Sequence, residues 1–247
     1  EDAQDQDGKR PDTVEVVLTA DGKETEQKVT LNAENNWTAN FTDLDEYKTG
    51  KLISYGVKEI SVSDYEVTIT EVQEGNFVVT NAHEPEVTEI SGTKTWDDAD
   101  NQDGKRPTSI KVRLYANEVE VDKLNVTAAD DWEYSFTDLP KYQEGEVIDY
   151  TVKEDAVPEY ETKQEGTNFT NIHEPELTGV KGTKTWDDAD NQDGKRPETI
   201  IVNLLANGEV TQTAEVTEET DWTYEFANLP KYESGKEITY AIQEVTI

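Results

Sequence analysis

The sequence predicts an all-β protein made of small β-sandwich domains in tandem. The first observation is a duplication: the 16-residue segment GTKTWDDADNQDGKRP occurs unchanged at 92–107 and 182–197, and a partial copy, DAQDQDGKRP, lies at 2–11. The second is that apolar residues alternate with polar ones, which is typical of half-buried strands. The third is that turn residues such as Asp-Gly and Asn-Gly separate these runs at short intervals. Short strands duplicated in this way favour repeated sandwiches.

The repeat has the length of a small domain. Lys94 and Lys184 are 90 residues apart, as are Asn81 and Asn171, which is longer than a solenoid unit. We expect the first domain to lack its first strand, the third to lack its last strand, and only the middle one to be complete, as in a segment of a longer array. The expected domains are residues 1–84, 85–174 and 175–247.

Strands are predicted where the alternation is strongest, and turns where it breaks. The His-Glu-Pro-Glu segments at 83–86 and 173–176 are expected to be short, stiff junctions, because proline stiffens them and no glycine-serine spacer follows. No stretch has a helical period. The alternating runs are 53–59, 77–81, 90–96, 110–114, 132–136, 148–154, 180–186, 200–204, 222–226 and 238–244.

The composition excludes several classes of partner. Lys and Arg number 22 against 56 Asp and Glu, and the net charge of −34 argues against binding to nucleic acid. No apolar run is long enough for membrane insertion, and the sequence as given predicts no signal peptide within it. Cysteine is absent. Small secreted domains often depend on disulfides, so an extracellular domain of this kind would need another covalent stabiliser.

Strand alternation places three kinds of polar side chain on the apolar faces. Lys94 shares a face with Trp96, Glu154 shares one with Val152, and Asn171 shares one with Phe169. Burying such groups unpaired would cost several kcal/mol each, so we expect them to meet. Taken singly, each has an ordinary explanation: a snorkelling lysine, a salt-bridging glutamate and an asparagine that satisfies backbone groups. The equivalent positions elsewhere are Glu59, Asn81, Lys184 and Glu244.

A lysine, a carboxyl group and a carboxamide in a dry core can form an amide bond. Burial lowers the pKa of the lysine and raises that of the glutamate, which leaves a neutral, nucleophilic amine. A protonated glutamate can donate to the amide carbonyl and pass a proton to the departing ammonia. Preorganised groups reach effective molarities of roughly 10⁵–10⁸ M. The product would be a Lys–Asn isopeptide bond, formed in a single turnover, so the chain is not expected to be an enzyme.

The ordered motifs resemble those of the Cna protein B-type domain. These motifs are G-T-K-T-W-D-D with N-Q-D-G-K-R-P, then W-x-Y-x-F-x-x-L-P-K-Y, Y-T-V-K-E and F-T-N-x-H, and they cover essentially all of the chain. The resemblance implies a prealbumin-like, immunoglobulin-related β-sandwich with a self-formed isopeptide bond between its first and last strands. It also implies a stalk module of a collagen-adhesin-like, cell-wall-anchored surface protein of a Gram-positive bacterium.

The resemblance assigns roles to the polar residues. Lys94 would supply the amine, Asn171 the carboxamide and Glu154 the assisting acid in the middle domain. The first domain keeps Glu59 and Asn81 without a lysine. The third domain keeps Lys184 and Glu244 without an asparagine. A Lys184–Asn81 link between two molecules is a further hypothesis, because unpaired strand edges invite strand addition.

The acidic loop at 97–104 raises the question of a calcium site. An EF-hand loop needs oxygen ligands at positions 1, 3 and 5, glycine at position 6 and glutamate at position 12. With Gly104 at position 6, Ala99 and Ile110 fall on two ligand positions, and neither can serve. A solvated turn is therefore the preferred interpretation, with a weak cation site left open. No cofactor or metal site is predicted.

Three functional classes remain, in order of preference. The first is a structural stalk whose contacts are neighbouring repeats of the same protein, with a host-matrix ligand bound by a head domain outside this segment. The second is an adhesin module that binds matrix directly, which would call for an exposed aromatic patch; no clear one is evident. The third is an enzyme acting on an outside substrate. Both histidines, His83 and His173, fall in the predicted junctions, which disfavours it.

Overall fold

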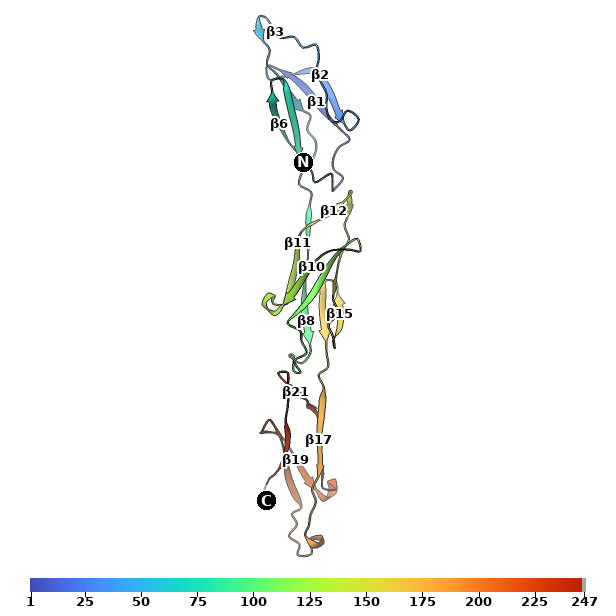
Figure 1. Ribbon diagram of the computed structural model, residues 1–247, viewed down its shortest axis with the longest axis vertical. Coiled ribbons are helices and arrows are strands. Elements are labelled where there is room, and N and C mark those ends of the chain that lie inside the picture. The colour runs from blue at the N-terminus through green and yellow to red at the C-terminus, as the bar shows by residue number, and fades with distance from the viewer. Residues whose placement is uncertain (246–247) are drawn as a thin grey trace. The chain divides into compact units, whose positions relative to one another are not determined.

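The computed structural model describes residues 1–245, and its regular structure is almost entirely β (Figure 1). This confirms the predicted all-β fold class. Residues 246–247, the end of the predicted third domain, lie outside the described residues. By contacts the chain forms two compact units. The first comprises Glu1–Ile90, Tyr115–Glu120 and Ser135–Thr151, and the second comprises Ser91–Leu114, Val121–Tyr134 and Val152–Ile247. The three domain ranges drawn from the sequence stay a prediction.

The first repeat contains a three-stranded sheet in the order β2-β1-β5, a β6-β7 hairpin and a small β3-β4 hairpin. Strand β1 supplies its core, because Val14, Val16, Val17 and Leu18 are all buried. The strands are β1 (Thr13–Ala20), β2 (Lys23–Asn32), β3 (Tyr47–Lys48), β4 (Lys51–Leu52), β5 (Tyr55–Glu59), β6 (Glu66–Gln73) and β7 (Asn76–Ala82).

The middle repeat contains a sheet in the order β10-β9-β14 and a four-stranded sheet in the order β11-β8-β16-β15. Strand β8 runs parallel to β16, while β15 and β16 are antiparallel. The elements are β8 (Val87–Asp97), β9 (Ser109–Ala116), β10 (Val119–Thr127), a 3-10 turn (Ala128–Asp130), β11 (Glu133–Pro140), β12 (Tyr142–Gln143), β13 (Glu146–Val147), β14 (Tyr150–Glu154), β15 (Glu161–Glu165) and β16 (Asn168–Ile172).

The third repeat packs the sheet β19-β18-β23 against the pair β17-β20. Its buried core comprises Ile200, Val202 and Leu204 of β18 together with Val216, Phe226 and Leu229. The elements are β17 (Leu177–Thr183), two 3-10 turns (Ala189–Asn191 and Glu218–Thr220), β18 (Thr199–Ala206), β19 (Glu209–Thr217), β20 (Thr223–Pro230), β21 (Tyr232–Glu233), β22 (Lys236–Glu237) and β23 (Tyr240–Glu244).

Identical sequence takes different structure in the two copies of the duplicated segment. Strand β8 extends through Asp97, whereas β17 ends at Thr183, the equivalent of Thr93. The additional residues of β8, Lys94–Asp97, are those that pair with β16. A strand continues only where its backbone groups find hydrogen-bonding partners. Pairing with β16 therefore explains why β8 continues through Asp97.

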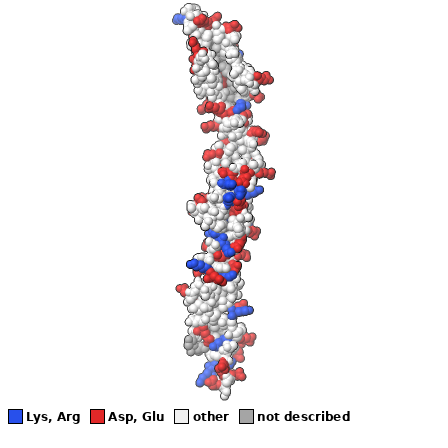
Figure 2. Space-filling model, in the orientation of Figure 1, with Lys and Arg blue, Asp and Glu red and all other residues white. Residues whose placement is uncertain are grey.

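Acidic side chains are spread over the surface, with fewer basic ones between them, as the visible face in Figure 2 shows. They agree with the strongly negative net charge. Among residues 1–245, no helix is long and apolar enough to cross a membrane.

Candidate functional site

The three polar residues predicted to point inward in the middle repeat come together in its core. Lys94 lies in β8, Glu154 at the end of β14 and Asn171 in β16. Lys94 is 3% exposed and Asn171 is fully buried, and the Glu154 side chain is 1% exposed. The parallel pairing of β8 with β16 sets Lys94 opposite Phe169 and Trp96 opposite Asn171, so the lysine and the asparagine enter the core from neighbouring strands.

The Glu154 carboxyl group contacts both of the other side chains. Its Oε2 lies 3.6 Å from Lys94 Nζ, and its Oε1 accepts a hydrogen bond of 2.8 Å from Asn171 Nδ2. Lys94 Nζ also donates to the carbonyl of Thr95 over 3.1 Å. Glu154 Oε2 and Asn171 Oδ1 are buried without a hydrogen bond in the described structure. The carboxyl group therefore sits between an amine and a carboxamide that retain unused hydrogen-bonding capacity.

Burial favours the uncharged form of both ionisable groups. Desolvation lowers the pKa of Lys94 to about 8, against the opposing attraction of Glu154. Desolvation likewise raises the pKa of Glu154, although Lys94 and Asn171 work to lower it. The Trp96 ring, whose centroid is 4.3 Å from Lys94 Nζ, helps to keep water from the amine. A proton shared between these groups therefore rests more readily on the carboxyl than it would in water.

The other two repeats each bring part of this set together. In the first, Asn81 Nδ2 donates to Glu59 Oε2 over 3.0 Å, and burial raises the pKa of Glu59. In the third, Lys184 Nζ lies 3.1 Å from both carboxyl oxygens of Glu244. These side chains are 23% and 39% exposed, so the inward position that alternation predicted for Glu244 is wrong, and this pair is an ordinary, partly solvated ion pair.

The acidic loop after β8 is a buried ionic network, and the solvated turn preferred from the sequence is wrong for two of its residues. Asp98 is 1% exposed and Asp103 is 7% exposed. Asp98 accepts two hydrogen bonds from the guanidinium group of Arg106 and one from Tyr160 Oη. The attraction of these partners outweighs desolvation and lowers the pKa of Asp98. No cluster of three or more metal-ligating side chains occurs within the part of the chain described.

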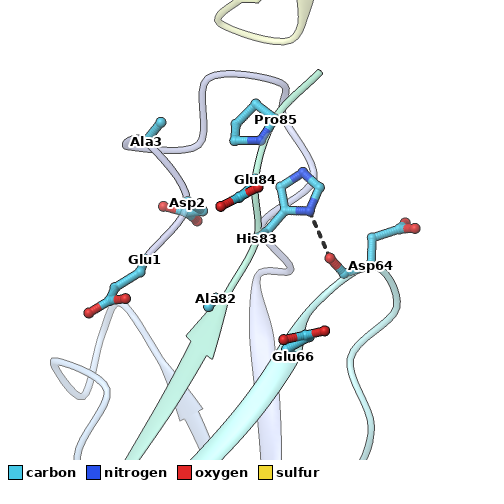
Figure 3. Close-up of a pocket in the computed structure, with 9 residues that line it drawn as sticks. All are labelled: Glu1, Asp2, Ala3, Asp64, Glu66, Ala82, His83, Glu84 and Pro85. Carbon is cyan, nitrogen blue, oxygen red and sulfur yellow. Dashed lines mark hydrogen bonds between the residues drawn. The ribbon is translucent and has the colours of Figure 1, made fainter. Parts of the chain in front are cut away.

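The sequence reasoning also missed the role of the two histidines. His173 Nε2 lies 2.6 Å from Asp103 Oδ2, and its Nδ1 lies 2.8 Å from the Glu159 carbonyl oxygen. His83 has the same arrangement, with Asp7 and with the Asp64 carbonyl, and Figure 3 shows the contact with Asp64. The hollow in that view, of 750 Å³, is lined by residues 1–3 and 82–85 together with Asp64 and Glu66. In the first two repeats, two aspartates separated by four residues and a later histidine occur at equivalent positions. This recurrence is the sequence signal that could have identified the network.

We expect both imidazoles to titrate above the ordinary pKa of about 6.5. Burial opposes protonation of His173, but the hydrogen bonds to Asp103 and the Glu159 carbonyl outweigh it and raise its pKa. For His83, the hydrogen bond to Asp7 is the main cause of the raised pKa. In each histidine, both imidazole nitrogens face an acceptor oxygen, so both must carry a hydrogen in order to donate.

A histidine whose pKa is raised by folding stabilises the folded state fully at pH values below its pKa in the unfolded chain. This stabilisation is lost as the pH rises through its pKa in the folded protein. Unfolding free energy should therefore fall above about pH 6.5, by at most about 1.4 kcal/mol per pH unit for each histidine. NMR titration of the imidazole protons checks this, with His83→Gln and His173→Gln assigning the two signals. Midpoints at or below 6.5 would contradict the expectation.

Comparison with known proteins places these features in a family. A sequence model of the Cna protein B-type domain matches residues 1–82, 90–172 and 180–247. A collagen adhesin of Staphylococcus aureus is 45% identical over 248 residues, which is all of this chain but 21% of that protein, so the chain spans about a fifth of that relative.

One solved structure agrees in fold. The crystal structure of two B repeat units, B1B2, of the collagen-binding protein Cna of Staphylococcus aureus is 44% identical, with a TM-score of 0.67, over 100% of this chain and 67% of that one. The structure of a single B1 repeat is 46% identical, with a TM-score of 0.36, over 66% of this chain and 87% of that one. The repeat matches, the all-β fold and the sequence identity together establish that this chain belongs to the Cna protein B-type domain family.

Proposed function

We propose that the chain is a stalk segment of a bacterial surface adhesin, whose middle repeat is locked by an isopeptide bond between Lys94 and Asn171. The observation that carries this proposal is the position of the Glu154 carboxyl, which contacts both Nζ of Lys94 and Nδ2 of Asn171 inside a dry core. The three domain ranges, 1–84, 85–174 and 175–247, form part of the proposal.

The reaction exchanges one amide for another. The neutral Lys94 amine attacks Cγ of Asn171 and forms an N–C bond. If the carboxamide is turned so that its oxygen faces Glu154, the protonated carboxyl donates to that oxygen over the same 2.8 Å and stabilises the developing negative charge. The bond from Cγ to Nδ2 then breaks. Glu154 passes a proton from the attacking nitrogen to the leaving one, ammonia departs, and the carboxyl group is regenerated.

Such a bond suits a cysteine-free stalk. A bond between Lys94 and Asn171 closes a 77-residue span (171 − 94), and it resists the reducing agents that break a disulfide. Because β8 and β16 are adjacent parallel strands, the bond would tie the strand that enters the middle repeat to the strand that leaves it. Tension carried along the chain would then pass through the crosslink without separating the sheets. The extracellular, wall-anchored location and a matrix-binding head elsewhere in the parent protein belong to this proposal.

Intact mass spectrometry tests the bond directly. We expect the chain to have the mass of its sequence less one ammonia, and Lys94→Met, Asn171→Ala and Glu154→Ala to have the full masses of their sequences. Fragmentation of the intact chain should show that a β8 peptide containing Lys94 is covalently joined to a β16 peptide containing Asn171. Lys184→Met is the matched control, because the third repeat has no asparagine strand among the described residues, and this variant should still lose one ammonia. A wild-type chain at full sequence mass after prolonged incubation would refute the crosslink.

A further inference from the structure

The loop after β8 contacts a hairpin of the following repeat. Residues 98–107 and the hairpin of β21 and β22 belong to the same compact unit, and the amide of Gly235 in the hairpin turn donates to the carbonyl of Gln102 over 3.0 Å. Gly104 and Gly235 both have positive φ, of 75° and 74°. A Cβ atom on Gly104 would lie 2.7 Å from Gly235 Cα, so the two backbones approach more closely than side chains would permit.

The same contact recurs with other residues between the first repeat and the middle one, within the first compact unit. Gly145, in the turn between β12 and β13, donates its amide to the carbonyl of Gln6 over 3.1 Å. Gly8 and Gly145 again have positive φ, and a Cβ atom on Gly8 would lie 3.1 Å from Gly145 Cα. The loop is therefore an interaction surface made of a backbone carbonyl and a glycine, and its partner is the glycine turn of another repeat.

The contact at the second junction is small. A hollow of 480 Å³ lies beside it, lined by Ala99, Asp100 and Gln102 of the loop and by residues of the third repeat that include Tyr232 and Ser234. Atoms that border an unfilled space lose the packing that neighbours would give them. The docked form therefore depends on the hydrogen bond and the close approach of the glycines, and a movement of the loop is enough to release it.

The loop is held in place by His173. Its Nε2 lies 2.6 Å from Asp103 Oδ2, and its Nδ1 lies 2.8 Å from the carbonyl oxygen of Glu159. A neutral imidazole has one N–H group, so it can donate to only one of these two oxygens. The Asp103 side chain is 2% exposed. Loss of the proton therefore leaves a buried carboxylate or a buried carbonyl without its donor, and both are unfavourable.

The other groups around this imidazole do not replace its charge. Lys105 Nζ lies 2.8 Å from the Glu159 carboxyl group and forms an ion pair with it. The Tyr160 ring centroid is 5.1 Å from that of His173, and a phenol ring carries no charge at neutral pH. The imidazolium is therefore the cation in direct contact with Asp103.

Asp103 connects the histidine to the docking surface. It lies in the chain between Gln102 and Gly104, the two loop residues that meet Gly235. When His173 is neutral, the carboxylate regains hydrogen-bond donors from water only if the loop moves. This movement carries the Gln102 carbonyl and the Gly104 backbone away from the hairpin turn.

From these observations we infer that the loop at 98–107 is a proton-dependent joint, which holds the glycine turn of the next repeat while His173 is charged and releases it when His173 is neutral. His83 and its contact with Asp7 give the first junction the same device. The inference does not rest on the proposed crosslink, because the joint uses none of the crosslink residues.

Distance measurements between spin labels test the joint on the full chain. The chain has no cysteine, so labels can be attached through Lys163→Cys in the middle repeat and Val210→Cys in the third, both exposed positions. We expect a narrow distance distribution at about pH 5.5 and a broad one at about pH 9, on either side of a histidine titration. His173→Gln should be broad at both pH values. Asp103→Asn should be narrow at both, because a carboxamide can pair with either form of the imidazole.

Gly235→Ala tests whether the contact and the proton are coupled. Its Cβ would lie 3.2 Å from Gly104 Cα, at a φ that alanine rarely adopts, so the distribution should be broad at both pH values. Since coupling is reciprocal, the pKa of His173 measured by NMR should fall in this variant, by about one unit for each tenfold by which the proton favours docking. Gly208→Ala is the matched control: its φ is 91° but nothing lies within 4 Å, so both measurements should stay as in the wild type.

Three results would overturn the inference: a wild-type distance distribution that does not change with pH, a pH response that persists in Asp103→Asn, or an unchanged pKa of His173 in Gly235→Ala. Lys94→Met should keep the full pH response. Failure of the crosslink would therefore leave the joint standing, and failure of the joint would leave the ammonia loss of the middle repeat unaffected.

Discussion

Replacing Lys94 by methionine is expected to lower the unfolding free energy of the middle repeat by about 4–5 kcal/mol, the chain-entropy value for a crosslink that closes a loop of this length. Methionine has a similar length and keeps apolar contacts in the core. Glu154 remains able to accept from Asn171 Nδ2 and can stay protonated, so the substitution removes the crosslink and leaves no buried charge. Most of the loss should therefore report the bond.

Calorimetry of the full chain measures this effect, and hydrogen exchange of peptides from β16 identifies the transition that belongs to the middle repeat. The control is Lys184→Met in the third repeat, where the lysine pairs with the partly exposed Glu244. We expect a change of about 1 kcal/mol or less there, the usual value of an exposed ion pair. Equal effects at the two lysines would mean that the crosslink contributes nothing to stability.

Replacing Arg106 by alanine is expected to destabilise the middle repeat by about 3–5 kcal/mol, because it leaves a buried carboxylate without its cation. The Asp98 side chain has no exposed surface, and it lies 2.6 Å from Arg106 Nη2. Tyr160 Oη and the Asn101 amide would remain as hydrogen-bond donors, but neither carries a charge. Urea unfolding of the variant and the wild type gives the difference.

The duplication supplies a matched control for this variant. Arg196 pairs with Asp188 in the same geometry, at 2.6 Å, but the Asp188 side chain is 27% exposed. Arg196→Ala should therefore destabilise its repeat far less than Arg106→Ala does. The Arg106→Ala penalty should also shrink in acid. The pKa of Asp98 is lowered in the intact protein, so its contribution is present at neutral pH and is lost as the pH falls through the folded value. A penalty that is equal at both arginines, or independent of pH, would contradict this account.

Much of the candidate site was predictable from alternation alone. Lys94, Glu154 and Asn171 fall on the apolar faces of their strands by parity, and all three side chains are buried. What alternation cannot predict is pairing between loops. Asp98 and Asp103 lie outside regular strands and look like surface charges in the sequence, yet they are buried because Arg106, Tyr160 and His173 reach them from elsewhere in the fold. The contacts of Asp98 with Tyr160 and of Asp103 with His173 join residues 62 and 70 positions apart, so strand alternation does not encode them.

The sequence by itself determined the fold class, the repeat, the family and, in the middle repeat, the inward direction of Lys94, Glu154 and Asn171. Only the tertiary structure decided which loop charges are buried and where the duplicated segment forms a strand. The segment GTKTWDD shows this most clearly: residues 94–97 form strand in one copy, while the identical residues 184–187 do not. The Asp98 side chain is fully buried, whereas that of Asp188 is partly exposed. The reason is that a strand and a buried charge both depend on partners from other parts of the chain: in the middle repeat β16 pairs with residues 94–97 and Tyr160 reaches Asp98, whereas the described part of the third repeat has neither contact.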